Sequence, residues 1–175
     1  MATTKTPVEF KGELKWVVVP PFSKPQVPFE TQPGKENNSH FSLEVECSQQ
    51  QYNDLIKQGV SRMTVLRSDE TTGKTFIRLR APKVNGTFTA PDPVVKNLGG
   101  SIVDVMIANG SEGIVAANIE SYDTKAGKRA TSLRFHTVVI TKLIPYVRKE
   151  KTVDDATASV LNNDDAHAGD ETGDW

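Results

Sequence analysis

The sequence is poor in the residues on which several common classes of protein depend. Its single cysteine, Cys47, excludes an intramolecular disulfide framework. Its three histidines, His40, His136 and His167, stand at no metal-site spacing, so we expect no metal and no cofactor. No apolar run approaches the roughly 18 residues of a membrane span, and the first residues hold no apolar signal segment. We therefore expect a soluble protein without membrane contact.

Motifs of catalysis are also missing. The run from Gly73 to Thr75 resembles the end of a phosphate-binding loop, but Ser68 stands where that motif needs a glycine, and a strand follows instead of a helix. No serine lies in a nucleophile-elbow pattern. The acid pair Asp69 and Glu70 falls at a predicted hairpin tip, where solvated charge is the ordinary state. These absences favour a binding protein and not an enzyme.

Charge, by contrast, is present in quantity and is unevenly distributed. Residues 153–175 hold seven acids, no lysine and no arginine, and they end on Trp175. Residues 1–152 keep all 21 bases but only 15 of the 22 acids, a net charge of +6. The last segment cannot bury enough apolar surface to offset its ordering entropy, so we expect a domain over 1–152 and a disordered acidic tail over 153–175. Such tails usually serve as interaction arms, and a solubilising tail is the alternative. The tail residues predicted to bind partners are Asp164, Asp165, Asp170, Glu171, Asp174 and Trp175.

Alternation of apolar and polar residues predicts short strands along the domain. The predicted strands cover residues 13–19, 40–47, 62–67, 75–80, 101–108, 113–122 and 133–143. In the second of them Phe41, Leu43, Val45 and Cys47 are expected to face in, and Ser42, Glu44 and Glu46 to face out.

One short helix is predicted after the second strand. It begins at the N-cap Ser48 and ends at Gly59, and a long loop is expected over 82–100. About seven strands without βαβ alternation predict an all-β fold, an antiparallel barrel or sandwich. A helix in mid-chain favours a small barrel of the oligonucleotide/oligosaccharide-binding (OB) type.

Arginines and an aromatic residue share one face of the predicted strand 75–80. If Ile77 and Leu79 point into the barrel, Phe76, Arg78 and Arg80 point out together, because side chains alternate along a strand. An exposed ring stacks on an unpaired base at ~1–3 kcal/mol, and guanidinium groups hold phosphates. The residues predicted to bind DNA are Lys15, Trp16, Arg67, Lys74, Phe76, Arg78, Arg80, Lys83, Tyr122, Lys125, Lys128, Arg129 and Arg134.

Several of these predictions have an ordinary structural alternative. The opposite register would bury Phe76, and Trp16 lies in phase with Leu14, which fits core packing equally well. Tyr122 beside a turn fits a half-buried anchor, and the lysines after it fit hairpin solubility.

The sequence resembles the single-stranded DNA-binding proteins of tailed bacteriophages. The resemblance lies in the opening strand ELKWVVVPP, the strand–helix join HFSLEVECSQQQYNDLIK, the segment TFIRLRAP, the Gly-Gly before SIVDVMIA, and the closing KLIPY. The acidic tail with a terminal aromatic residue is its most specific element. Members of that family usually end in Phe, so Trp175 departs from the pattern while keeping an apolar ring.

The resemblance implies an OB fold and sequence-independent binding of single-stranded DNA in phage replication, recombination and repair, in the cytoplasm of an infected bacterium. It also implies that the tail recruits replication proteins such as the DNA polymerase and competes with DNA for the basic groove. A β-barrel structural or adaptor protein and an RNA-binding barrel of cold-shock type are the alternatives. Nothing in the sequence marks a dimer interface, so a homodimer stays open.

Overall fold

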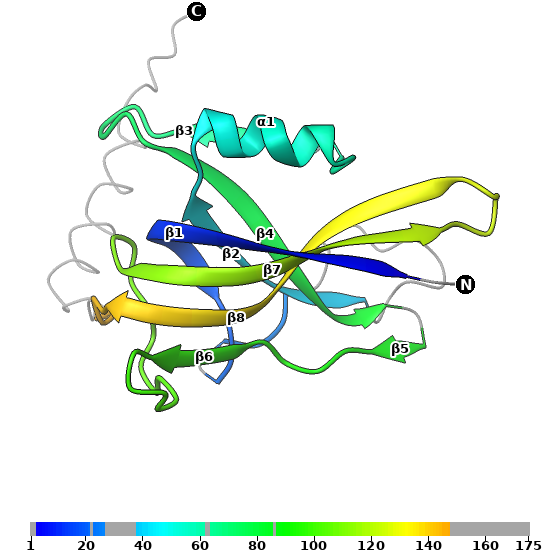
Figure 1. The fold of residues 1–175 in the computed structure, drawn as a ribbon. Helices are drawn as coiled ribbons and strands as arrows, with labels where there is room; N and C mark the ends of the chain where they lie inside the picture. The colour runs from blue at the N-terminus through cyan, green and yellow to red at the C-terminus, as the bar shows by residue number, and fades with distance from the viewer. Residues whose placement is uncertain (1–2, 22, 27–37, 62–63, 86, 148–175) are drawn as a thin grey trace, which may run out of the picture.

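Eight strands and one helix make up the described part of the chain (Figure 1). The computed structural model describes residues 3–21, 23–26, 38–61, 64–85 and 87–147, so the predicted tail lies outside the described residues. The elements are β1 (Thr4–Val18), β2 (Ser39–Glu46), α1 (Gln49–Lys57), β3 (Leu66–Ser68), β4 (Thr75–Asn85), β5 (Phe88–Thr89), β6 (Val94–Asn97), β7 (Glu112–Asp123) and β8 (Arg129–Lys142).

Five of the strands close into a barrel. β1 pairs with β2 and β7, β2 pairs with β4, and β7 pairs with β8, all antiparallel. β8 then joins β4 in parallel through one pair, Arg80 and Arg134, which completes the ring β1–β2–β4–β8–β7. A five-stranded barrel of this order is the OB fold. The predicted fold class is confirmed, with one parallel seam in an otherwise antiparallel barrel.

The barrel interior is filled by alternate side chains of these strands. On β4, Ile77 and Leu79 are fully buried, whereas Arg78 and Arg80 are exposed, so the predicted register is confirmed. Burying each such aliphatic side chain contributes ~1.5–3 kcal/mol. Cys47 also faces the core, where burial raises the pKa of its thiol to about 11 and keeps it protonated.

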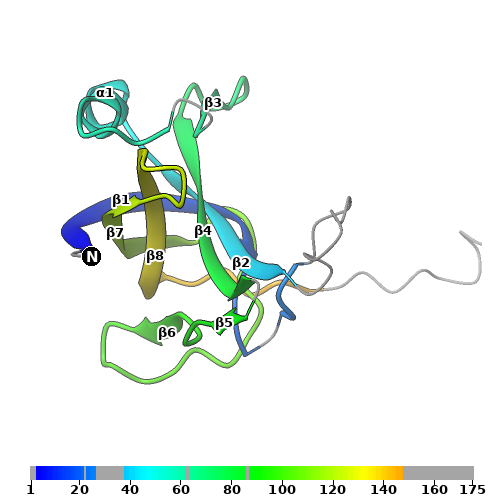
Figure 2. The same ribbon diagram turned by 90° about the vertical axis from the view of Figure 1, so that its right-hand side faces the viewer.

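The helix α1 lies at the same end of the barrel as β3 and away from β5 and β6 (Figures 1 and 2). The Ser48 side chain caps it by accepting a hydrogen bond from the Gln51 N–H at 3.1 Å. Gln58 is the C-cap, and Gly59 follows with a φ of 89°, a conformation that favours glycine. Leu55 points into the core. Because α1 has nine residues, no helix in the described part of the chain could span a membrane.

Two predictions about the middle of the chain are wrong. The loop expected over 82–100 contains the end of β4 together with β5 and β6, and β6 pairs with β8. The segment 101–108 is not a strand, since it makes only isolated bridges from Ile102 to Lys96 and from Ile107 to Pro145.

Candidate nucleic-acid interface

The outer face of β4 borders three neighbouring hollows that share lining residues, and together we call them the groove. The aromatic pocket has a volume of about 330 Å³ and is lined by Trp16, Val17, Val18, Gln26, Ser42, Arg78, Met106, Ile107, Ala108, Asn109 and Tyr146. The middle hollow, about 380 Å³, is lined by Thr64, Val65, Arg67, Arg78, Arg80 and Leu133. The arginine hollow, about 400 Å³, is lined by Asn38, Ser39, His40, Val60, Ser61, Thr64, Arg80, Pro82, Val84, Asn85, Thr131, Ser132, Leu133 and Arg134. Arg78 joins the first to the second, and Arg80 joins the second to the third.

The aromatic pocket exposes large apolar side chains to solvent. Trp16 is 62% exposed and Tyr146 is 53% exposed, and Met106 is exposed beside them. Trp16 was in phase with core residues of β1, but the pairing of β1 with β2 shifts between Lys15 and Val18. This irregularity turns Trp16 out of the barrel, so the core alternative does not hold for it.

The arginine hollow concentrates positive charge and hydroxyl groups. Arg80 and Arg134 lie opposite each other across the parallel seam and both line the hollow. Arg134 has an ion pair with Glu120 at 3.6 Å, whereas Arg80 has none with any described acid. The Ser132 Oγ beside the same hollow is buried and has no hydrogen-bond partner among the described residues. The two guanidinium groups suit an anion such as a phosphate.

His40 lines the arginine hollow near the start of β2. Burial, followed by the positive charges of Arg80 and Arg78, lowers the pKa of His40 below its ordinary value of 6.5. Burial and the two arginines thus both disfavour the charged form of His40.

A buried acid pairs with two arginines of the middle hollow. Glu44 was expected to face out into solvent, yet its exposure is only 5%. Its Oε1 accepts hydrogen bonds from Arg78, at 2.8 and 3.1 Å, and from Arg67 at 3.3 Å. The two guanidinium groups cover the carboxylate. Glu44 therefore lies on the predicted side of the strand, but its side chain is not exposed to solvent. Ser42 is likewise buried on that side, where its hydroxyl donates to Gln26 Oε1 at 2.9 Å.

The prediction that Phe76 is an exposed stacking ring is wrong. Phe76 lies on the outer side of β4, outside the core cluster, but is only 2% exposed. β3 pairs alongside it through Arg67, and the Lys15 ammonium lies 4.4 Å from the centre of its ring. The Lys15 ammonium also makes an ion pair with Asp69 and, through this hydrogen bond, lowers the pKa of the Asp69 carboxyl. Lys15 and Phe76 thus form part of a closed contact that borders none of the three hollows.

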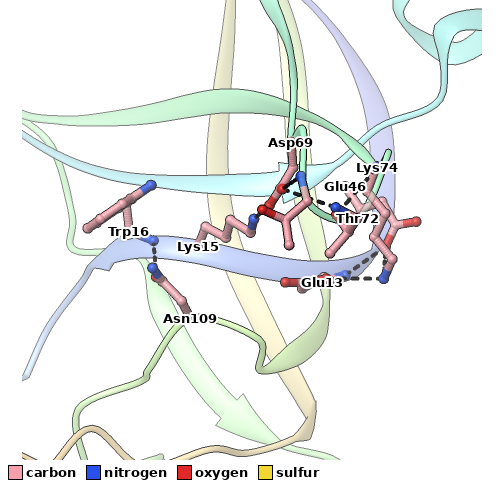
Figure 3. A network of polar contacts seen from close by, with 9 residues as sticks. Glu13, Lys15, Trp16, Glu46, Asp69, Thr72, Lys74 and Asn109 are labelled. Atoms are coloured by element: carbon pink, nitrogen blue, oxygen red, sulfur yellow. Dashed lines mark hydrogen bonds and ion pairs between the residues drawn. The ribbon is translucent and has the colours of Figure 1, made fainter.

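Lys74 belongs to the same polar cluster, seen in Figure 3. Its ammonium contacts Glu13 at 3.1 Å and Glu46 at 3.4 Å, and the hydrogen bond to Glu13 raises the pKa of Lys74. Gly12, with a φ of 149°, lets Glu46 approach, because a Cβ there would stand 2.6 Å from the Glu46 Oε2. The cluster ties the turn between β3 and β4 to β1.

The remaining predicted residues line none of the three hollows. Lys83 makes an ion pair with Asp92 at 2.5 Å. The hairpin of β7 and β8 projects from the barrel (Figure 1) and carries Tyr122, Lys125, Lys128 and Arg129. Of the thirteen predicted residues, the groove brings together Trp16, Arg67, Arg78, Arg80 and Arg134. A role of the others in binding stays a prediction.

Several groove residues were missed by sequence reasoning. They are His40, Glu44, Met106, Asn109, Ser132 and Tyr146. For Tyr146 there is a signal, because it is the aromatic residue of the closing segment KLIPY. For the others no local pattern distinguishes a groove residue from an ordinary strand or turn residue.

The chain was compared with known families, curated proteins and solved structures. No family model matches the sequence, and no curated protein matches it. Among solved structures, the chain is similar to gp2.5, a single-stranded DNA-binding protein of bacteriophage T7, with 13% identity, a TM-score of 0.48, and coverage of 98% of this chain and 100% of that one. It is also similar to the single-stranded DNA-binding protein of bacteriophage Enc34 in complex with single-stranded DNA, with 12% identity, a TM-score of 0.47, and coverage of 83% and 89%. These are proteins of the kind that the sequence resembles, and at these values the likeness assigns no function to this chain.

Proposed function

We propose that this chain binds single-stranded DNA without base preference along the groove on the outer face of β4. The observation that carries the proposal is the combination of exposed aromatic side chains, Trp16 and Tyr146, with Arg80 and Arg134 in the groove. Bases stack on the rings, and phosphates pair with the guanidinium groups. Stacking requires an unpaired base and accepts any of the four bases. We therefore expect a preference for single strands and no sequence preference.

The test is a titration with labelled oligo-dT and with duplex DNA of equal length, each at about 50 and 200 mM salt. We expect tight binding to oligo-dT that weakens steeply as salt rises, because bound counterions are released. Equal affinity for duplex, or no affinity for either ligand, would contradict the proposal. A parallel titration with oligo-rU separates DNA binding from the RNA-binding alternative.

The wider role that we propose follows the sequence resemblance. The domain over residues 1–152 coats and protects single-stranded DNA during phage replication, recombination and repair, and itself performs no catalytic step. The acidic tail over 153–175 recruits replication proteins such as the DNA polymerase and competes with DNA for the positive groove. Its carboxylates and terminal ring offer the same two kinds of group as a strand of phosphates and bases.

Deletion of residues 153–175 tests the tail. We expect higher affinity for oligo-dT at low salt, because a competing anion is removed, and loss of polymerase binding in a pull-down. Unchanged affinity for DNA would leave the tail a recruitment arm only. Unchanged polymerase binding would contradict the recruitment role.

A further inference from the structure

The backbone of Trp16 is held in an unusual conformation. Its φ of 49° is the only positive value among the described residues other than glycine. A side chain with a Cβ adopts this left-handed region at a cost in free energy, which persists only where surrounding contacts impose it. Burial does not supply the compensation, because the Trp16 side chain is mostly exposed.

Asn109 supplies a contact to the backbone at Trp16. The pairing of β1 with β2 shifts between Lys15 and Val18. Within this irregular stretch the Trp16 N–H donates to Asn109 Oδ1 at 2.8 Å, across 93 residues of sequence (Figure 3). In that figure the Trp16 side chain points away from the cluster around Lys15. The Asn109 bond thus fixes the backbone at the point where the tryptophan leaves the barrel.

The same turn is joined to β1 by two backbone bonds. The Leu14 N–H donates to Ser111 O at 2.7 Å, and the Gly110 N–H donates to Leu14 O at 3.1 Å. Gly110 has a φ of 92°, which suits a glycine. Together with the Asn109 bond, these contacts set the distance between the turn and Trp16.

Ser111 connects this turn to the other side of the aromatic pocket. Its fully buried Oγ accepts a hydrogen bond from the Ile144 N–H at 2.9 Å and lies 2.9 Å from Ala108 O. Two residues further along, the Tyr146 N–H donates to Met106 O at 2.9 Å. One turn therefore holds Trp16 on one side and the segment of Tyr146 on the other.

We propose that Asn109 is a positioning residue that holds Trp16 ready to stack on an unpaired base in the aromatic pocket. Ser111 fixes the segment of Tyr146 in the same way, so the pocket exists before DNA arrives. The inference rests on the proposed function, which it deepens by naming what presets the stacking site. An amide suits the position because it accepts the hydrogen bond without bringing negative charge close to the phosphates.

The experiment uses full-length protein carrying Trp175→Phe, which leaves Trp16 as the single tryptophan. Asn109→Ala is expected to lower the fluorescence anisotropy of Trp16 in the free protein and to weaken oligo-dT binding by roughly fivefold, because a mobile ring stacks less well. Asn109→Asp keeps the acceptor, so it is expected to restore the anisotropy. In a Trp16→Ala background, Asn109→Ala is expected to have no further effect on affinity.

Asn97→Ala is the matched control. Asn97 Oδ1 accepts a hydrogen bond from the Ser101 N–H at 3.0 Å, the same kind of contact in a turn that borders none of the three hollows. We expect this substitution to leave the Trp16 anisotropy and the affinity for oligo-dT unchanged. A loss of affinity from Asn109→Ala that is equally large without Trp16, or an unchanged Trp16 anisotropy, would overturn the inference.

Amide hydrogen exchange of the unsubstituted protein covers the case in which Asn109→Ala does not fold. The Trp16 amide is expected to exchange at least about tenfold more slowly than in an unstructured chain, and an unprotected amide overturns the inference. A parent protein that does not bind oligo-dT contradicts the proposed function. The anisotropy and exchange of Trp16 in the free protein still decide whether Asn109 positions it.

Discussion

The two ends of the groove differ in chemistry and in the way each is held. The aromatic pocket presents large rings and is fixed by backbone hydrogen bonds to one turn, through Asn109 and Ser111. The arginine hollow presents Arg80 and Arg134, which meet across the single parallel pair that closes the barrel. Stacking depends weakly on salt, whereas phosphate contacts depend on it steeply. The two ends should therefore contribute to binding in ways that salt can separate.

Glu44 lies between the two ends and reduces the charge of the middle of the groove. Its carboxylate is covered by Arg78 and Arg67, so these arginines reach the groove already partly neutralised. A count of basic residues thus overstates the attraction for DNA. We therefore expect Arg80, which has no described acidic partner, to contribute more to the proposed binding than its neighbour Arg78.

The largest effect is expected from charge reversal at the arginine hollow. Arg80→Glu with Arg134→Glu should weaken oligo-dT binding roughly a hundredfold at about 50 mM salt. The slope of log affinity against log salt should become shallower by about 1.4, since each phosphate contact on a single strand contributes about 0.7. Fluorescence anisotropy titrations at several salt concentrations measure both quantities.

The matched control for this reversal is Lys125→Glu with Lys128→Glu. It changes the net charge equally in the turn between β7 and β8, where Lys125 and Lys128 line none of the three hollows. A much smaller loss of affinity is expected. An equal loss from both pairs would mean that overall charge, and not the arginine hollow, determines binding.

Removing the rings should have a smaller effect of a different kind. Trp16→Ala is expected to weaken oligo-dT binding roughly tenfold while leaving the salt slope unchanged, because a stacking contact releases few counterions. Tyr146→Ala should act in the same direction. Trp16→Phe, which keeps an aromatic face, should recover most of the loss. A changed salt slope in Trp16→Ala would mean that the two ends are not separable.

Neutralising the acid between the two ends should strengthen binding. Glu44→Gln keeps an oxygen that can accept from Arg78 but removes a negative charge close to the phosphates, so affinity at low salt should rise roughly threefold. Glu46→Gln, which changes an acid of the cluster around Lys74, serves as the control and should have little effect. Weaker binding by Glu44→Gln would show that the acid is needed to orient the arginines.

The smallest effect expected is a pH dependence through His40. In the free protein burial and the arginines Arg80 and Arg78 lower the pKa of His40. Bound phosphates offset that positive charge, so the pKa should rise in the complex and the complex should take up protons. Affinity should then increase by about twofold as pH falls between the two pKa values. Nuclear magnetic resonance titration of His40 with and without oligo-dT measures the shift, and His40→Gln should abolish the pH dependence.

The alternation of apolar and polar residues predicted the barrel and the arginines on the outer face of β4. Alternation on β4 placed Ile77 and Leu79 inside, and Arg78 and Arg80 had to follow on the other side. Alternation does not reveal which residues cover a side chain on the outer side of a strand. Lys15 of β1 covers Phe76 of β4 there, and Arg78 of β4 covers Glu44 of β2.

The aromatic pocket was less predictable because contacts distant in sequence create it. Trp16 leaves the core phase at an interruption of strand pairing, and Asn109, which stabilises that conformation, lies 93 residues away. The apolar run 101–108 was read as a strand because periodicity does not reveal whether a pairing partner exists. In the structure part of that run, including Met106, forms one side of the pocket instead.

The seam between β4 and β8 connects the groove with the stability of the barrel. One residue pair joins these two strands, and its members, Arg80 and Arg134, both line the arginine hollow. A phosphodiester held by both arginines would act as a crosslink between the two edges, so the barrel could not open at the seam until the strand dissociated. Bound DNA should then slow amide exchange beside the seam more than between β1 and β7. The protein would be hardest to unfold while it is loaded, and proteases would preferentially remove molecules that carry no DNA.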